Sequence, residues 1–133
     1  MNLSQATPLG GGGGGQTTAD IIHENSGPFD TVESTSLTDV DTFTMPYEGM
    51  CVARIDYTDR GGSASNYTRI FQITGPGGEV DFMANYRHYP TPQPAWPSGR
   101  LTPGAYTVRV AKGAGTSSYN ITVTKITVFA WKE

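Results

Sequence analysis

Cysteine and histidine are both scarce in this sequence of 133 residues. Cys51 is the only cysteine, so the chain can form no intrachain disulfide and no cysteine-based metal site. It lies within an alternating apolar stretch without a nearby histidine, and we therefore expect it to be a small core residue. The two histidines, His23 and His88, are far apart in the sequence and lack obvious partners. Catalysis by a thiol or an imidazole is not indicated.

The chain also has few charges, and neither sign dominates. It contains 9 Lys and Arg and 12 Asp and Glu, for a net charge of −3, and charged residues make up 16% of the sequence. A typical soluble domain contains roughly 25%. The basic residues are scattered, so there is no basic face to neutralise phosphates and we expect no nucleic-acid partner.

Long apolar runs are absent. No run approaches the ~18 residues of a membrane-spanning helix, so we expect no membrane partner. Residues 1–10 have neither the basic nor the apolar region of a secretory signal. The expectation is a protein that is made and assembled in a cytosol.

Recognisable catalytic motifs are missing as well. The sequence contains no GxSxG, GxxxxGK[ST] or HExxH pattern. Asp20, His23 and Glu24 lie close together without metal-ligand spacing, which favours a solvated segment. The Asp-Val-Asp segment 39–41 is the best candidate for a Ca²⁺ site, but a role in a turn is favoured because no DxDxDG-like loop is present. We therefore expect no enzymatic activity, no cofactor and no bound metal.

The first 28 residues differ from the rest, and we divide the chain into an arm (residues 1–28) and one domain (residues 29–133). The arm contains six consecutive glycines, which offer no side chains to a core. It is either a flexible linker or an arm that threads into a neighbouring subunit, where glycine permits close backbone approach. In the second case the partner-binding residues are Leu9, Gly10, Gly11, Gly12, Gly13, Gly14 and Gly15. Residues 17–24 are expected to form a helical turn or a short strand.

From residue 29 onward, alternating apolar and polar residues predict an all-β fold, a single antiparallel β-sandwich. The expected strands cover residues 31–36, 41–45, 50–57, 66–74, 79–89 and 106–111, followed by a strand that starts at residue 119. In the strand 50–57, the residues expected to face the core are Cys51, Ala53, Ile55 and Tyr57. A strong turn signal, Gly-Pro-Gly-Gly, occupies residues 75–78.

The clearest alternation lies between residues 101 and 123. Side chains expected to share the core face are Tyr106, Val108, Val110 and Ile121. Glycines at positions 113 and 115 lie between the two alternating runs and can adopt the positive φ angles of a tight reversal. The pattern predicts two strands that pair as one hairpin.

The last strand continues beyond residue 123, where the alternation slips. From Thr124 onward, Ile126 and Val128 continue the apolar register only if a bulge or bend intervenes, which leaves Phe129 and Trp131 on the opposite face. So long a strand either bends between the sheets or pairs at its end with another chain. Because an uncovered edge with two aromatic residues would favour aggregation, we expect Phe129 and Trp131 in an oligomer interface.

An aromatic and proline-rich segment follows the strand 79–89. Four prolines between residues 90 and 97 are expected to exclude ladder pairing and to stiffen the loop. The loop then displays a surface-binding patch that consists of Tyr86, His88, Tyr89 and Trp96. The alternative is that Trp96 folds back to cap the edge of the sandwich.

Several stretches resemble bacterial pre-peptidase C-terminal domains. They are the Asp-x-aromatic strand at 40–45, the glycine at 49 with the strand 50–56, Leu-Thr-Pro-Gly-Ala-Tyr at 101–106, and the strand 119–123. Because these domains are jelly-roll β-sandwiches, the resemblance, over about residues 29–126, implies that fold. Members of this family are attached to secreted proteases, whereas for this chain we expect neither a secretion signal nor an attached protease.

A small β-sandwich with a glycine-rich N-terminal arm is similar in architecture to phage virion components such as capsid decoration (cement) proteins and fibre subunits. This similarity implies a structural protein assembled in the host cytoplasm into the virion. Its expected partners are the major capsid protein or other virion subunits, and its expected state is a homo-oligomer, with a trimer as the assumed number. The alternatives are a carbohydrate- or surface-binding module and a Ca²⁺-stabilised accessory domain.

Overall fold

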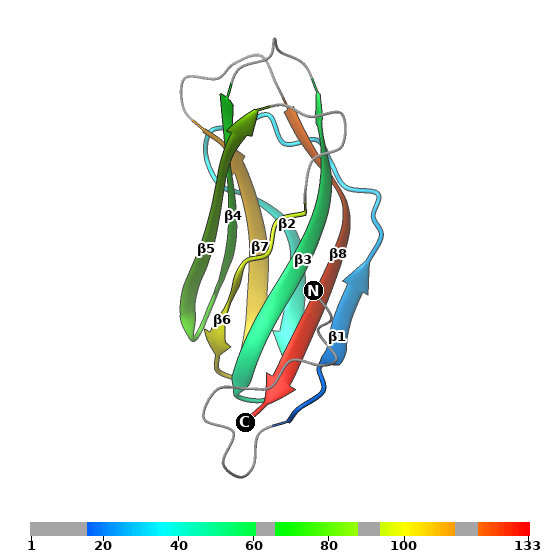
Figure 1. Cartoon of the computed structure of the whole chain (residues 1–133), viewed down its shortest axis with the longest axis vertical. Coiled ribbons are helices and arrows are strands. Elements are labelled where there is room, and N and C mark those ends of the chain that lie inside the picture. The colour runs from blue at the N-terminus through cyan, green and yellow to red at the C-terminus, as the bar shows by residue number, and fades with distance from the viewer. Residues whose placement is uncertain (1–15, 61–65, 88–93, 114–119) are drawn as a thin grey trace.

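The computed structural model describes residues 16–60, 66–87, 94–113 and 120–133, which fold into two β-sheets packed face to face (Figure 1). Each sheet has four strands, and the strand pairs are antiparallel. No helix occurs in this part of the chain. The predicted all-β sandwich is therefore confirmed.

Successive strands lie in different sheets except for β4 and β5, which are neighbours in one sheet. Sheet A contains, in spatial order, β1 (Asp20–Asn25), β8 (Asn120–Lys132), β3 (Gly49–Arg60) and β6 (Ser98–Leu101). Sheet B contains β2 (Thr38–Met45), β7 (Gly104–Lys112), β4 (Asn66–Gly75) and β5 (Gly78–Arg87). The orders 1-8-3-6 and 2-7-4-5 are those of an eight-stranded jelly roll built from two Greek keys, so the predicted jelly-roll type is confirmed as well.

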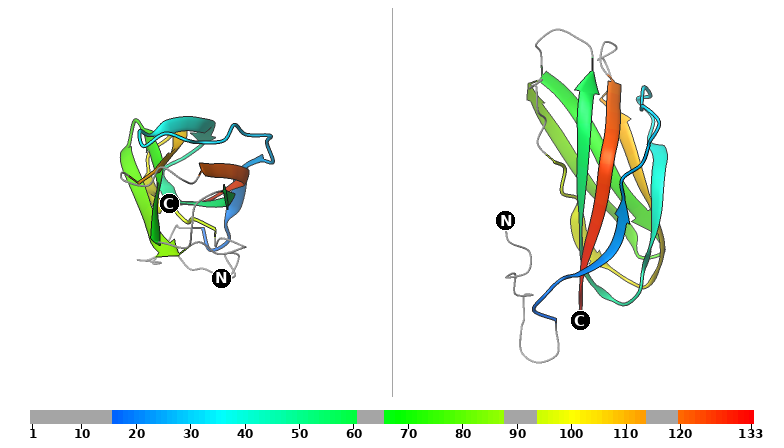
Figure 2. Two further views of the ribbon diagram at one scale, coloured as in Figure 1. Left: turned by 90° about the horizontal axis from the view of Figure 1, so that it is seen from above. Right: turned by 90° about the vertical axis from the view of Figure 1, so that its right-hand side faces the viewer.

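The core lies between the sheets, as the end-on view shows (Figure 2, left). The side chains that the alternation assigned to it are buried, and they are Cys51, Ala53, Ile55, Tyr57, Tyr106, Val108, Val110 and Ile121. Phe71 and Ile73 complete the middle of the core from β4. Period-2 alternation therefore identified the inward face of these strands correctly.

The hairpin predicted between residues 101 and 123 is wrong. Strand β7 pairs with β2 and β4 in sheet B, whereas β8 pairs with β1 and β3 in sheet A. The chain between them crosses from one sheet to the other. Alternation identifies a strand and its buried face, but it does not select the pairing partner, which here lies far away in the sequence. A tight hairpin does occur at the Gly-Pro-Gly-Gly turn signal of residues 75–78, where Gly75 pairs with Gly78 between β4 and β5.

The first strand lies earlier than the sequence suggested. Residues 31–36 form no strand, and Val32 makes only an isolated bridge to Ile121. Asp20–Asn25, placed within the arm by the sequence, is instead strand β1, at the edge of sheet A beside β8 (Figure 2, right). Of the two structures considered for residues 17–24, the short strand is correct. The sandwich thus begins before residue 28, because this segment pairs with the second half of β8.

Strand β8 confirms the predicted bulge but is not an edge. Asp56 pairs with Lys125 and Tyr57 with Val123, so Thr124 is the extra residue. After the bulge Ile126 and Val128 return to the core. The expectation of an uncovered strand end is wrong, because β1 and β3 flank β8 on both sides.

Candidate functional site

The outer face of sheet A carries a continuous group of apolar side chains. Strand pairing places Ile21 beside Phe129 and Phe129 beside Val52 in one row, and Met50 beside Trp131 in the next. Trp96, just before β6, packs against the same cluster. We call this group the apolar patch, and it consists of Ile21, Met50, Val52, Trp96, Phe129 and Trp131.

Trp131 is the anchor of the apolar patch. It is only 5% exposed and contacts Val52, with Ala19, Trp96 and Phe129 packed around them. The backbone of Trp131 packs closely against Gly49 of β3. A Cβ atom at Gly49 would lie 1.9 Å from the Trp131 carbonyl oxygen, so only glycine fits there. The indole Nε1 is buried and has no hydrogen-bond partner in the structure. A buried N–H donor without an acceptor lowers the stability of the fold. The apolar patch therefore contains one donor whose hydrogen bond is not made within the described residues.

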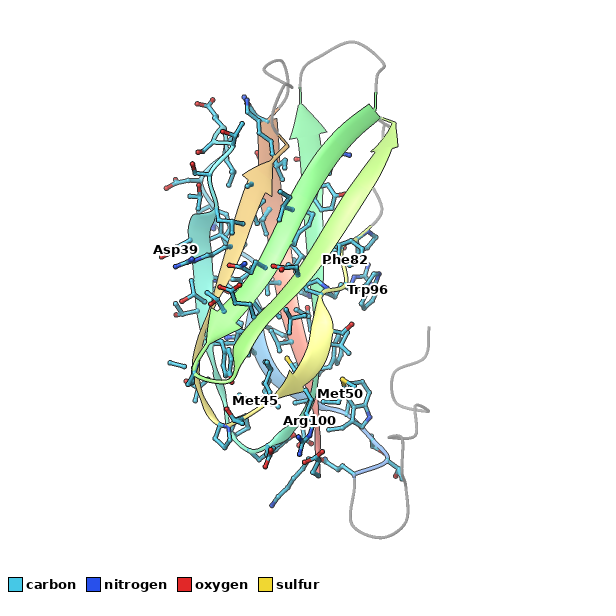
Figure 3. All side chains as sticks on the ribbon, turned by 90° about the vertical axis from the view of Figure 1, so that its left-hand side faces the viewer. Asp39, Met45, Met50, Phe82, Trp96 and Arg100 are labelled. Atoms are coloured by element: carbon cyan, nitrogen blue, oxygen red, sulfur yellow. The ribbon has the colours of Figure 1, made fainter. Side chains whose placement is uncertain are left out.

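Trp96 reaches the patch because the segment before β6 pairs with β3. The amide and carbonyl groups of Ala95 bond to Ile55 at 3.0 and 2.9 Å, and the Pro97 carbonyl accepts from Ala53 at 3.0 Å. The expectation that prolines exclude ladder pairing here is therefore wrong, since a proline can still accept at a sheet edge. Ala95 points into the core, so Trp96 points outward. Figure 3 shows Trp96 and Met50 projecting to one side of the molecule and Asp39 to the other.

A cation lies over the Trp96 ring. The Arg54 guanidinium carbon is 5.5 Å from the ring centroid, and the same guanidinium pairs with Asp56 at 3.1 Å. One face of the indole is thereby occupied, while the ring as a whole remains half-buried. The indole therefore lies against sheet A rather than standing free as a stacking platform.

The other predicted site residues are described only in part. Tyr86 lies in β5, but its side chain is outside the described set, as are His88 and Tyr89. The partner-binding arm, Leu9 to Gly15, also lies outside the described residues. Its attachment point is described: the Gln16 amide donates to the Lys132 carbonyl, and Gln16 Oε1 accepts from the Lys132 amide, both at 2.8 Å. Residues 1–15 therefore join the sandwich at Gln16, which is bonded to Lys132 next to Trp131.

Strand β1 is held across the sandwich by side-chain bonds. His23 Nε2 lies 2.7 Å from Asp41 Oδ2 on β2, so the histidine has a partner that the sequence did not reveal. The segment 39–41 lies within β2 and not in a turn. The Tyr47 hydroxyl donates to Asp20, and this bond holds the pKa of the Asp20 carboxyl below its usual value. These bonds join the N-terminal strand of sheet A to the sheet B side.

The described residues offer little for chemistry. Burial raises the pKa of the Cys51 thiol to about 12, so the thiol is protonated at neutral pH and is not a nucleophile. Among the residues searched, no three His, Cys, Asp or Glu side chains are grouped as metal ligands. No helix of the described chain is long and apolar enough to cross a membrane.

The outer face of sheet B has a different chemistry. One row of paired residues crosses its four strands, and it consists of Asp39, Arg109, Gln72 and Asp81. Within this polar row, Arg109 donates to Asp39 at 2.8 Å and Gln72 donates to Asp81 at 2.9 Å. The Gln72 side-chain oxygen is buried without a partner. The neighbouring row contains Thr42, Thr107 and Thr74.

Sequence reasoning treated Trp96 and the pair Phe129 and Trp131 as two separate sites, and the structure brings all three together. It missed Ile21 and Met50, which border the same cluster. Met50 precedes the core residue Cys51 in an alternating strand, so its outward position was detectable, but its neighbours were not. Comparison of the sequence with models of known protein families gives no match, and comparison with characterised proteins gives none either.

Proposed function

We propose that this chain is a non-enzymatic structural protein of a phage virion, a decoration protein that stabilises the capsid shell. The observation that carries the proposal is the position of Gln16, the residue that follows the glycine run. Gln16 is bonded to Lys132, which is next to Trp131 of the apolar patch. The attachment point of the arm and the apolar patch thus lie side by side at one end of sheet A. Apolar patches on a protein surface mark sites of interaction.

The jelly roll is compatible with this role but does not select it. The same architecture occurs in viral capsid proteins, lectin domains and cupins, so the argument rests on the surface chemistry. In the proposed mechanism, the arm lies across the shell subunits and the sandwich protrudes from them. Each contact contributes about 25 cal/mol for every Å² of apolar surface buried. The summed contact free energy opposes the internal pressure on the shell.

Particle binding tests the proposal directly. Purified protein is added to capsids that lack it, from the virus that encodes the chain, and binding is measured by co-sedimentation. We expect the full chain to bind and a variant without residues 1–15 to lose binding. The deletion retains Gln16 and every strand, so circular dichroism should show a folded sandwich. Leu37→Lys, which alters an exposed side chain outside the patch, is the matched control and should bind normally. Unchanged binding of the deletion variant would refute the proposal.

A second candidate is recognition of a surface glycan, and the polar row on sheet B favours it. Carboxylate, guanidinium and amide groups in one row can donate to and accept from sugar hydroxyl groups. Arg54 already covers one face of Trp96, so sheet B is the better place for such a ligand. A glycan array probed with the wild type and with Arg109→Ala tests this function. A signal that disappears in the variant supports it, and no signal for the wild type opposes it.

A further inference from the structure

Three large apolar side chains are exposed in the described part of the chain: Ile21 at 58%, Met50 at 41% and Leu37 at 37%. Two of them belong to the apolar patch. Ile21 lies on β1 next to Phe129, and Met50 lies on β3 next to Trp131. The exposed surface of the patch therefore spans the three adjacent strands β1, β8 and β3. A sheet face of this kind can pack against a second flat face.

Most of the charges that border the patch are paired within the chain. Along one side, Arg54 pairs with Asp56 at 3.1 Å and Lys125 with Glu24 at 3.8 Å, and each of these two ion pairs is close to neutral as a unit. At the other end, Arg100 pairs with both Glu48 and Glu133, which leaves one net negative charge in that cluster. An identical face can therefore approach along the neutral side without like charges meeting, and the charged cluster can stay hydrated at the rim.

The number of apolar surfaces constrains the symmetry of self-association. A ring, such as a trimer, requires two different complementary surfaces on each subunit, whereas a two-fold dimer uses one surface twice. Outside the patch, Leu37 is the one other large apolar side chain exposed in the described residues. A single exposed side chain does not make a second apolar surface. Within the described residues, one apolar patch thus fits the two-fold arrangement.

We propose that the apolar patch on sheet A binds the same patch of a second copy of this chain, which forms a two-fold symmetric dimer. This proposal deepens the proposed function, on which it rests, because it names the partner of the surface beside the arm. In the dimer, Ile21 and Met50 are buried between two sheets, with the rows of Phe129 and Trp131 beneath them. In both copies Gln16, where residues 1–15 join the sandwich, is bonded to Lys132 beside this interface.

Sedimentation velocity and light scattering on the full chain, without particles, test the dimer. We expect a mass twice the 14.2 kDa of one chain, that is 28.4 kDa. Met50→Lys and Ile21→Lys should each weaken association about tenfold or more, which corresponds to about 1.4 kcal/mol. Leu37→Lys is the matched control, because it places the same charge at a similarly exposed apolar position outside the patch. It should leave the dimer intact.

Three outcomes overturn the proposal. They are a monomeric wild type, a trimer, and a dimer that Leu37→Lys weakens as much as Met50→Lys does. Both patch positions are exposed, so the variants should fold, and their unfolding midpoints in urea verify this. Particle binding is measured separately. A dimer that binds no particle refutes the proposed function and leaves the interface standing, whereas a monomer that binds particles does the reverse.

Discussion

The two outer faces of this sandwich have the same backbone architecture and different chemistry. Sheet A presents the apolar patch, and sheet B presents a row of Asp39, Arg109, Gln72 and Asp81 with threonines beside it. Both faces follow the same alternation, with every second residue turned away from the core. The two sheets differ in the outward half of the pattern, because the inward half builds one shared core. In our proposals sheet A is therefore the contact face, while sheet B faces solvent or a hydrophilic ligand.

Among the described residues, each outer face also buries one polar side-chain atom without a hydrogen-bond partner. On sheet A it is the donor Nε1 of Trp131, which is surrounded by apolar side chains. On sheet B it is the acceptor Oε1 of Gln72, which lies among charged and amide groups. The unpaired atom therefore has apolar surroundings on sheet A and polar surroundings on sheet B. Substitutions at these residues measure how much each outer face contributes to stability.

The largest expected effect is that of Trp131→Ala. Removal of an indole that is 5% exposed should lower the free energy of unfolding by about 3–5 kcal/mol, as for other buried tryptophans. The corresponding change on sheet B, Arg109→Ala, removes a partly exposed ion pair with Asp39 and should cost about 1 kcal/mol or less. Urea denaturation measures both values. Equal costs would show that the two faces do not differ as described.

A smaller effect is expected for Gln72→Met. The substitution removes the hydrogen bond to Asp81, but it also removes the buried carbonyl oxygen that has no partner. These two changes oppose each other, so the free energy of unfolding should change by about 1 kcal/mol or less. A loss above about 3 kcal/mol, the upper end of the cost of an unpaired buried group, would mean that the polar row is a structural network.

The smallest effect concerns pH and the N-terminal edge of sheet A. The Tyr47 hydroxyl is the main cause of the lowered pKa of Asp20. A carboxyl whose pKa is lower in the folded chain stabilises the fold above the unfolded value of about 3.9, and this contribution is lost as the pH falls through the folded pKa. Tyr47→Phe should therefore flatten the decrease in stability below about pH 4. Urea midpoints of both proteins across this range test the effect, and identical profiles would refute the role of Tyr47.

Alternation in the sequence was enough to predict the sandwich, the core face of β3 and β7, and an irregularity, a bulge or a bend, in the last strand, which the structure shows to be a bulge at Thr124. It failed where pairing depends on distant residues. Strands β7 and β8 have the same period and follow each other directly, yet each pairs with strands far away in the chain. For the same reason Phe129 and Trp131 could be assigned to the outward face, but their proximity to Trp96, Ile21 and Met50 could not be predicted. That proximity results from the order 1-8-3-6, which no local pattern contains.

We propose that a second copy of the chain covers the apolar patch of sheet A, whereas Leu37 lies outside that interface. Hydroxyl-radical footprinting of the full chain, at low and high protein concentration, compares two side chains of similar exposure, Met50 at 41% and Leu37 at 37%. The account predicts that the oxidation of Met50 falls as the concentration rises, while that of Leu37 stays constant. Constant oxidation of Met50, or an equal fall at both residues, would contradict it.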